Sequence, residues 1–279
     1  MTATQKRLII NNIVLTLSTL SALIGIMFLF WILYVLIANG IEAINWDIFL
    51  FEGAPPGYEE SGLKHALIGQ LILISVSTLI GVPLGVMAGT YLSEYGQNSK
   101  LAETIRDISD IMMSAPSIVI GAFVYAVIVI PTGNFSGWAG VAALAIIMIP
   151  IILRTTDDML ALVPNTLREA AFALGAPKYK VILQVVYRGA KAGVLTGILL
   201  GIARVGGETA PLLFTSFNDN FMSTDLNEPM ASLTVTMYNY ATSPYDDWQQ
   251  IGWAAAFILS MFILGLNIIG RLIILKKKR

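Results

Sequence analysis

Long apolar segments, separated by shorter polar ones, occupy most of this chain. A helix that crosses a bilayer needs about 20 predominantly apolar residues. Six segments approach or exceed this length, and they cover residues 13–38, 65–91, 108–130, 138–153, 193–217 and 252–275. The pattern predicts an all-α, polytopic membrane protein with six transmembrane helices, in a single transmembrane domain that spans residues 1–279.

The composition supports a membrane protein. Of the 279 residues, 56% are hydrophobic and 13% are charged, whereas soluble domains average about 45–50% and about 25%. So large a surplus of apolar residues cannot be buried in a water-soluble core. The first apolar segment follows Lys6 and Arg7, as in a signal peptide. We expect it to stay as a spanning helix, because its apolar run is too long and no small-residue cleavage site follows it.

The basic residues predict the orientation of the chain. Lysine and arginine are retained in cytoplasmic loops. With the N-terminus inside, fifteen of the 17 basic residues fall on the cytoplasmic side, Lys64 falls outside, and Arg204 lies within a span. We therefore expect a multi-pass protein of the inner (cytoplasmic) membrane with both termini cytoplasmic. The loop 154–192 would be cytoplasmic and the long, acidic loop 218–250 extracytoplasmic.

Residue counts argue against several other classes of protein. The chain has no cysteine and one histidine, His65, so disulfides, thiolate sites and multi-histidine metal sites lack their ligands. A net charge of −1 without a basic patch argues against nucleic-acid binding. An intramembrane hydrolase using Asp110 or Glu208 is an alternative, although Asp110 is expected at the inner membrane interface. We expect no catalytic residue, no metal and no cofactor bound by this chain.

Two predicted spans carry glycines at intervals of four. Residues four apart lie on one face of a helix, and small residues let transmembrane helices approach closely. Both stripes therefore predict tight helix packing, and packing without a role in transport is the simpler alternative. The glycines are Gly81, Gly85 and Gly89 in the second span, and Gly193, Gly197 and Gly201 in the fifth.

An arginine and a glutamate lie near the middle of the fifth span. Arg204 is the twelfth residue of the apolar run and Glu208 the sixteenth. A charge at the centre of a spanning helix costs roughly 2.5–3.5 kcal/mol on insertion scales, so it is expected to face protein or water. Gly206–Gly207 and Pro211 predict that this part of the helix is interrupted, as in many substrate sites of transporters. The pair is either a buried salt bridge or a guanidinium site for an anion, with Glu208 accepting a hydrogen bond from a protonated oxyanion.

Two polar loops contain segments with apolar residues. In the loop 218–250, residues 233–240 could lie along the membrane surface, or the whole loop could be solvated. In the loop 154–192, good helix formers extend from Leu167 to Leu174, and Gly175 and Pro177 end them. A short helix outside the membrane could lie in a groove of a soluble partner, or simply connect two spans.

The second loop carries a recognisable motif. Glu169-Ala170-Ala171, followed after three residues by Gly175, resembles the EAA loop of ABC-importer permeases, the element that docks on the ATPase subunit. In that family an Ile-x-Leu-Pro pattern follows. Val185, Tyr187 and Arg188 occupy the corresponding positions here, so the leucine and the proline are absent.

Other segments resemble the A-type permease subunits of phosphate-specific transport (Pst) systems. The most specific is the segment of Arg204 and Glu208, residues 201–214, which reads Gly201-Ile-Ala-Arg-Val-Gly-Gly-Glu-Thr-Ala-Pro-Leu-Leu-Phe214. The third span contributes Ala115-Pro-Ser-Ile-Val-Ile-Gly121, and the last outer loop contributes Tyr238-Asn-Tyr-Ala-Thr-Ser-Pro-Tyr245.

This resemblance implies a fold, partners and roles. The fold would be that of type I ABC importer permeases (MetI-like), and the chain would form half of the pathway of an ATP-driven phosphate importer. A second permease subunit (PstC-like), two ATPase subunits (PstB-like) and an extracytoplasmic phosphate-binding protein (PstS-like) would complete it. ATP-Mg would bind the ATPase subunits, since the chain has no G-x-x-x-x-G-K-[ST] motif.

The resemblance also assigns residues to these roles. Phosphate passage would involve Arg204, Glu208 and Thr209, and coupling to the ATPase would involve Glu169, Ala170, Ala171, Leu174 and Gly175. A permease for another oxyanion, such as molybdate or sulfate, is an alternative. A receptor-like scaffold without transport is another, and it predicts that Arg204→Ala leaves uptake unchanged.

Overall fold

A computed structural model describes residues 3–58, 60–96 and 99–276. Lys277, Lys278 and Arg279, which contribute to the predicted orientation, lie outside the described residues. In chain order, the helical elements of the described part are α1 (Ala3–Ala43), α2 (Asp47–Leu50), α3 (Lys64–Thr90), η1 (Tyr91–Tyr95), α4 (Lys100–Ser114), α5 (Ser117–Val124), η2 (Tyr125–Val129), α6 (Ile130–Thr132), α7 (Gly137–Ala161), α8 (Asn165–Ala173), α9 (Lys178–Val181), η3 (Ile182–Val186), α10 (Tyr187–Gly206), α11 (Ala210–Leu213), α12 (Leu233–Ala241) and α13 (Asp246–Lys276).

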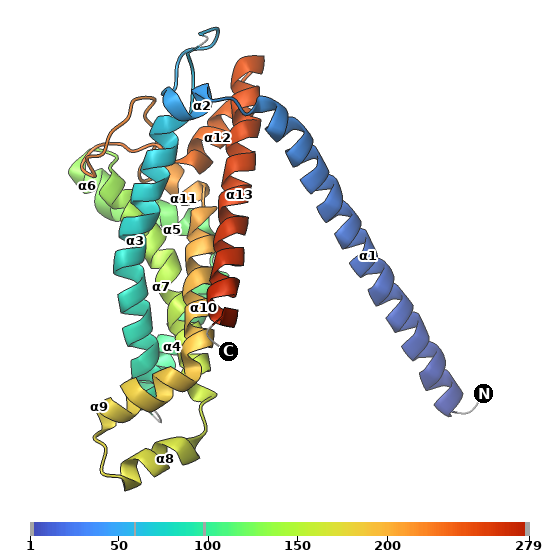
Figure 1. Cartoon of the computed structure of the whole chain (residues 1–279), viewed down its shortest axis with the longest axis vertical. Helices are drawn as coiled ribbons and strands as arrows, with labels where there is room; N and C mark the ends of the chain where they lie inside the picture. Colours follow the sequence, from blue (N-terminus) through green and yellow to red (C-terminus); the bar gives the residue numbers. More distant parts are fainter. Residues whose placement is uncertain (1–2, 59, 97–98, 277–279) are drawn as a thin grey trace.

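The described residues form an all-helical bundle with one long helix beside it (Figure 1). Five helices are long and apolar enough to cross a membrane, and a bent pair of helices makes a sixth candidate. These spans match the six predicted apolar segments in number and order. The three η elements are π-helical turns that continue α3, α5 and α9.

The third predicted span, residues 108–130, is not one straight helix. It consists of the end of α4 followed by α5, η2 and α6, and the axis bends by 104° between Ser114 and Ser117. Ala115 and Pro116 adopt extended backbone conformations at the bend. Proline lacks an N–H and disfavours the α conformation for the residue before it, which favours a helix end at this position.

Several helices extend beyond the apolar segments that predict the spans. α7 continues to Ala161 and α9 begins at Lys178, so helical structure covers both ends of the predicted loop 154–192. Residues 162–177, between these two helices, contain α8. α13 likewise begins at Asp246, ahead of the last predicted span at residue 252.

The core of the bundle lies around α7, which packs between α3 and α10. The glycines predicted to pack face α7 from both sides. A Cβ at Gly85 of α3 would lie 2.8 Å from the Cβ of Ile152, and a Cβ at Gly201 of α10 would lie 3.0 Å from its Cγ1. Gly81 and Gly89 face α7 in the same way, as do Gly193 and Gly197. Ile152 thus contacts one glycine of each stripe, and other residues of α7 contact the remaining glycines.

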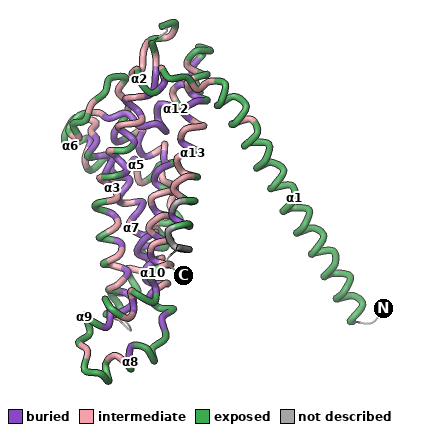
Figure 2. The backbone as a smooth tube through the Cα atoms, viewed as in Figure 1, coloured by how far each residue is buried: buried purple, intermediate pink, exposed green. Residues whose placement is uncertain are grey.

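The first helix stands apart from the bundle. α1 diverges from the other helices in Figure 1 and touches α13 only near its own C-terminal end. A Cβ at Gly40 would lie 2.5 Å from the Cβ of Phe257 at this contact. Figure 2 shows that the rest of α1 is exposed along its whole length. Its apolar side chains therefore have no partner within the described chain, and lipid or another subunit must cover them.

The sequence suggested that residues 233–240 lie along the membrane surface or belong to a solvated loop. The structure shows a third arrangement, in which the segment is packed into the bundle. It forms α12, which begins where the Ser232 hydroxyl accepts a hydrogen bond from the Val235 amide at 3.3 Å. α12 packs against α3 and α13, and Leu233, Val235 and Tyr240 are almost fully buried. Its alternating polar and apolar residues concealed this burial, because threonines also occupy buried positions of the helix.

Candidate functional site

The fifth spanning helix is interrupted at the predicted pair of charges. α10 ends at Gly206, Glu208 and Thr209 follow as non-helical residues, and the short α11 begins at Ala210 with Pro211 in its first turn. Glycine weakens a helix interior, and proline is tolerated in a first turn, where its missing N–H has no intrahelical acceptor. The sequence therefore fixes both the end of α10 and the start of α11.

The carboxylate of Glu208 accepts a hydrogen bond from Nη1 of Arg204 across this break. The two partners differ in exposure: the side chain of Glu208 is 5% exposed, and that of Arg204 is 53% exposed. The carboxylate is thus held inside the bundle, while the guanidinium reaches the surface of this chain. Arg204 shares its exposed face of α10 with Leu200, one turn away.

Backbone groups freed by the break are satisfied by side chains from other helices. The amide of Gln70 on α3 donates from Nε2 to the Gly206 carbonyl at 3.1 Å and accepts from the Leu233 amide at 3.0 Å. The Thr234 hydroxyl of α12 donates to the Glu208 carbonyl at 2.8 Å. Buried backbone polar groups need such partners. Gln70 was not among the predicted site residues, although it is the one side-chain amide in the apolar segment 65–91.

Thr209 lines a hollow of about 430 Å³ that lies between α12 and α13. Its other lining residues include Met237 and Tyr238 of α12 and Trp253 of α13. The three residues predicted for substrate passage therefore lie within one short segment but face different surroundings. Glu208 is buried, Arg204 is half exposed, and Thr209 faces this hollow.

The predicted coupling residues lie on α8 and the turn after it, at one extremity of the molecule (Figure 1). Gly175 has φ +78°, a left-handed conformation that residues with side chains disfavour. Its amide donates a hydrogen bond to the Phe172 carbonyl at 2.9 Å, which ends the helix. Glu169, Ala170 and Leu174 are exposed, and Ala171 is half-buried. Leu174 is 89% exposed. α8 thus presents a free surface away from the bundle.

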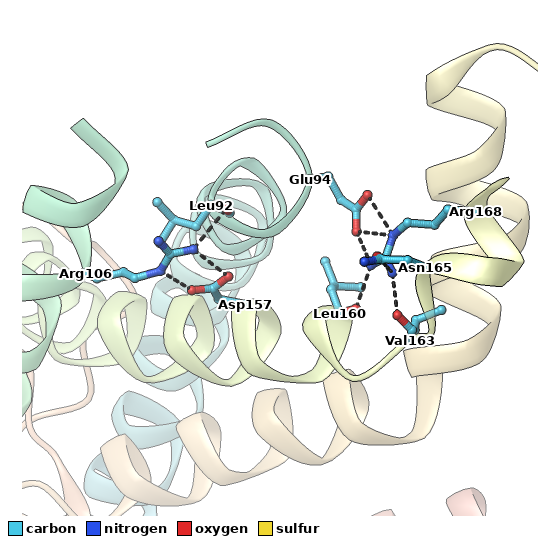
Figure 3. Close-up of polar contacts among 8 residues, drawn as sticks. All are labelled: Leu92, Glu94, Arg106, Asp157, Leu160, Val163, Asn165 and Arg168. Carbon is cyan, nitrogen blue, oxygen red and sulfur yellow. Dashed lines mark hydrogen bonds and ion pairs between the residues drawn. The ribbon is translucent and has the colours of Figure 1, made fainter. Parts of the chain in front are cut away.

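Arg168 attaches α8 to the rest of the protein. Its Nη2 lies 2.6 Å from Oε1 of Glu94 on η1, and both side chains are at most 10% exposed. The same guanidinium donates to the Leu160 carbonyl at 2.9 Å and to the Val163 carbonyl. Figure 3 shows these bonds converging on one side chain. α8 is therefore connected directly to η1, which continues α3, and to the C-terminal end of α7.

A second arginine makes a similar connection. Nε of Arg106 on α4 donates to Oδ2 of Asp157 on α7 at 2.7 Å, and Nη2 donates to the Leu92 carbonyl on η1 at 3.1 Å (Figure 3). Neither Glu94 and Arg168 nor Arg106 and Asp157 were predicted as pairs, because their members are 74 and 51 residues apart in the sequence. Among the described residues, no group of three or more histidine, aspartate or glutamate residues is placed to hold a metal ion.

Comparisons with known proteins identify the family of this chain. Residues 81–279, which include the broken α10 and the α8 loop, match the family described as "Binding-protein-dependent transport system inner membrane component". This chain belongs to that family. As an inner membrane component of such a transport system, it spans the membrane with the several apolar helices described above.

Full-length relatives of this inner membrane component share a common description. The "Phosphate transport system permease protein PstA" of Pasteurella multocida is 51% identical over 269 residues, which cover 96% of each chain. The protein of the same description from Xylella fastidiosa (strain 9a5c) is 46% identical, over 98% of this chain and 96% of the relative. "Phosphate transport system permease protein PstA 1" of Mycobacterium tuberculosis (strain H37Rv) is 35% identical, over 97% of this chain and 89% of the relative.

A solved structure shows the fold. A chain of the MetNI methionine ABC transporter in an inward-facing conformation aligns with a TM-score of 0.62 and 19% identity. The alignment covers 78% of this chain and 95% of that chain. The protein thus has the MetI-like fold of type I ABC importer permeases, as the EAA-like motif implied.

Proposed function

We propose that this chain is a permease subunit of an ATP-driven importer of inorganic phosphate and forms half of the translocation pathway. The assignment of phosphate as the substrate rests on relatives described as phosphate transport permeases. They are 46–51% identical to this chain over almost its whole length. The position of Arg204 supports it, because a guanidinium fork matches the geometry of a phosphate oxyanion.

We propose that the exposed face of Arg204 lines the pathway. Burying a half-exposed arginine against lipid would be costly, so this face of α10 requires water or protein opposite it. A second permease subunit of similar fold would supply the other wall. Glu208 would keep the guanidinium pointed into the pathway, and Thr209 would contribute a hydroxyl near it.

We further propose that α8 docks on an ATPase subunit. The exposed Leu174 and the exposed face that contains Glu169 and Ala170 suit a partner surface, and the Arg168–Glu94 pair supplies a rigid connection to α3. Two ATPase subunits would bind ATP-Mg, one on each permease, and an extracytoplasmic binding protein would deliver phosphate.

Reconstitution tests this proposal. The chain is co-purified with its second permease and ATPase subunits, placed in liposomes with the binding protein, and supplied with labelled phosphate and ATP. We expect uptake that requires ATP and the binding protein, and ATP hydrolysis that phosphate stimulates. Competition by unlabelled phosphate but not by sulfate or molybdate supports the assignment, whereas stronger competition by either of the others overturns it.

A further inference from the structure

A groove at the α8 end of the bundle has the character of a lipid site. Its larger part is a hollow of about 540 Å³ between the end of α3 with η1 and the segment α9–η3, within the range of about 300–1,000 Å³ typical of small-molecule sites. The lining is mainly apolar and aromatic and includes Met87, Tyr91, Tyr95, Tyr179, Leu183 and Tyr187. Tyrosine is enriched where a membrane meets water.

The groove continues an exposed apolar face of α3. Ile80, Leu84, Met87 and Tyr91 recur at intervals of four, three and four residues and are 37–67% exposed, so they lie on one side of the helix. No charged residue occurs in α3 after His65. An acyl chain that lies against this face would therefore reach the groove without leaving apolar surroundings.

The second part of the groove is basic. An adjoining hollow of about 310 Å³ shares Leu183 and Tyr187 with the first and is also lined by Arg188 and Lys191. Nζ of Lys178 lies 4.3 Å from the ring centroid of Tyr95, which lines the first hollow. The segment 170–207 contains five basic residues and no acidic one. Basic pockets between transmembrane helices are suited to anionic lipid headgroups.

We propose that this groove binds an anionic phospholipid of the inner leaflet. Its phosphate would pair with Arg188 and Lys191, and its acyl chains would lie against Met87 and Leu183. The charge of the groove favours an anionic lipid over a zwitterionic one. Thr90 and Tyr187 both line the first hollow, and their hydroxyls are 2.5 Å apart, so α3 and α10 are joined at the groove without a lipid.

The site lies beside the connection to α8. η1 carries both Tyr95, which lines the groove, and Glu94, which holds Arg168 of α8. A bound lipid would therefore contact the same turn of helix that anchors the coupling helix. This inference concerns lipid and does not depend on which anion the transporter carries.

Native mass spectrometry of the whole transporter complex tests the proposal. The complex is stripped of lipid and then titrated with phosphatidylglycerol or with phosphatidylcholine of the same acyl chains. We expect preferential binding of phosphatidylglycerol, and about fivefold weaker binding for each of Arg188→Gln and Lys191→Gln, since one basic residue near a membrane surface contributes about 1 kcal/mol. Lys6→Gln, an exposed basic residue near the start of α1, the helix that stands apart from the bundle, serves as the control and leaves the affinity unchanged.

Equal binding of the two lipids, or unchanged affinity in both groove variants, overturns the proposal. A photo-crosslinking residue in place of the exposed Leu183 provides a second measurement in native membranes. Crosslinks to phosphatidylglycerol support the proposal. Crosslinks to another subunit of the transporter instead show that protein fills the groove, and they overturn it.

Discussion

At the scale of single residues, two arginines have opposite environments. Arg204 is half exposed and keeps its guanidinium at the surface of α10, where an anion can reach it. Arg168 is buried and uses its donors on Glu94 and two backbone carbonyls. In the proposed function, the exposed part of the Arg204 guanidinium contacts phosphate, whereas Arg168 connects α8 to the bundle. The sequence separated the two by position, with Arg204 inside a predicted span and Arg168 in a predicted loop; the structure adds that the arginine of the loop is the buried one.

Replacing Arg204 with lysine tests the proposed contact with phosphate. Lysine keeps the positive charge but loses the planar fork. Losing one charge-assisted hydrogen bond, worth about 1.5–3 kcal/mol, should lower the rate of phosphate uptake roughly 10- to 100-fold. Uptake into liposomes measures this effect, and Arg7→Lys on the exposed α1 is the matched control. Wild-type uptake by Arg204→Lys would remove Arg204 from the pathway.

Glu208→Gln tests selectivity between oxyanions. Hydrogen phosphate carries an O–H that a carboxylate accepts, whereas sulfate has no proton to donate. A neutral amide also offers a donor, so the variant should discriminate less strongly against sulfate. Competition of sulfate with labelled phosphate measures this preference, with Glu103→Gln on the exposed surface of α4 as the control. An unchanged preference would show that Glu208 serves only to hold Arg204.

The Glu94–Arg168 pair predicts non-additive effects. Removing one partner of a buried ion pair costs about 3–5 kcal/mol, because the other charge stays buried and unpaired. We expect Glu94→Gln and Arg168→Gln each to lower thermal stability and the ratio of phosphate uptake to ATP hydrolysis. The double variant should lose less than the sum of the two.

The more exposed ion pairs of Arg154 serve as the comparison for the Glu94 and Arg168 variants. Nε of Arg154 lies 3.7 Å from Asp110 and 3.8 Å from Asp158, and all three side chains are at least 34% exposed. Arg154→Gln should therefore change stability by no more than about 1 kcal/mol. Strict additivity of the Glu94 and Arg168 variants would show that their contact does not stabilise the fold.

At the scale of elements, close contacts around α7 organise the bundle. The glycine stripes of α3 and α10 let both helices approach the same side chain, Ile152. Two other elements depart from simple helices because of proline and glycine: the bend before α5 and the break after α10. Each departure leaves backbone groups that neighbouring elements must satisfy, and Gln70 and Thr234 do so at the break.

Alanine at Gly85 tests the contact between α3 and α7. The added Cβ would lie 2.8 Å from the Cβ of Ile152 and 3.1 Å from the Ile149 carbonyl oxygen. Overpacking of this kind costs about 1–3 kcal/mol, so the thermal stability of the purified protein should fall. A Cβ at Gly265 of α13 meets no atom within 4 Å, and Gly265→Ala should keep or slightly raise stability, as alanine does in helices. Equal effects of the two changes would contradict the packing role of Gly85.

At the scale of the whole molecule, the bundle has two distinct ends. α8, the N-terminal end of α1 and the C-terminal end of α13 lie toward one end in Figure 1, and α2 and α12 lie toward the other. The excess of lysine and arginine predicts that the α8 end is cytoplasmic. The break between α10 and α11 lies between the two ends in Figure 1, where a pathway through the membrane would pass.

Single cysteines test this orientation, since the chain has none of its own. Ser223→Cys lies at a partly exposed position in the segment between α11 and α12, and Ala170→Cys lies on the exposed surface of α8. An impermeant maleimide should label Ser223→Cys from the extracytoplasmic side, and should label Ala170→Cys only after the inner membrane is opened. The reverse pattern of labelling would invert the predicted topology.

The sequence by itself predicted the class of the protein, the order of its apolar helices and, through the motifs, its family. Apolar length, proline and glycine act locally, so they can be read along the chain; the break at Gly206–Gly207 and the turn at Gly175 are examples. The tertiary structure decided which groups meet. Gln70 with Gly206, Glu94 with Arg168, and the burial of α12 all join segments distant in sequence, where contact depends on how helices pack. The exposure of Arg204 beside a buried Glu208 likewise follows from the faces that α10 turns toward its neighbours.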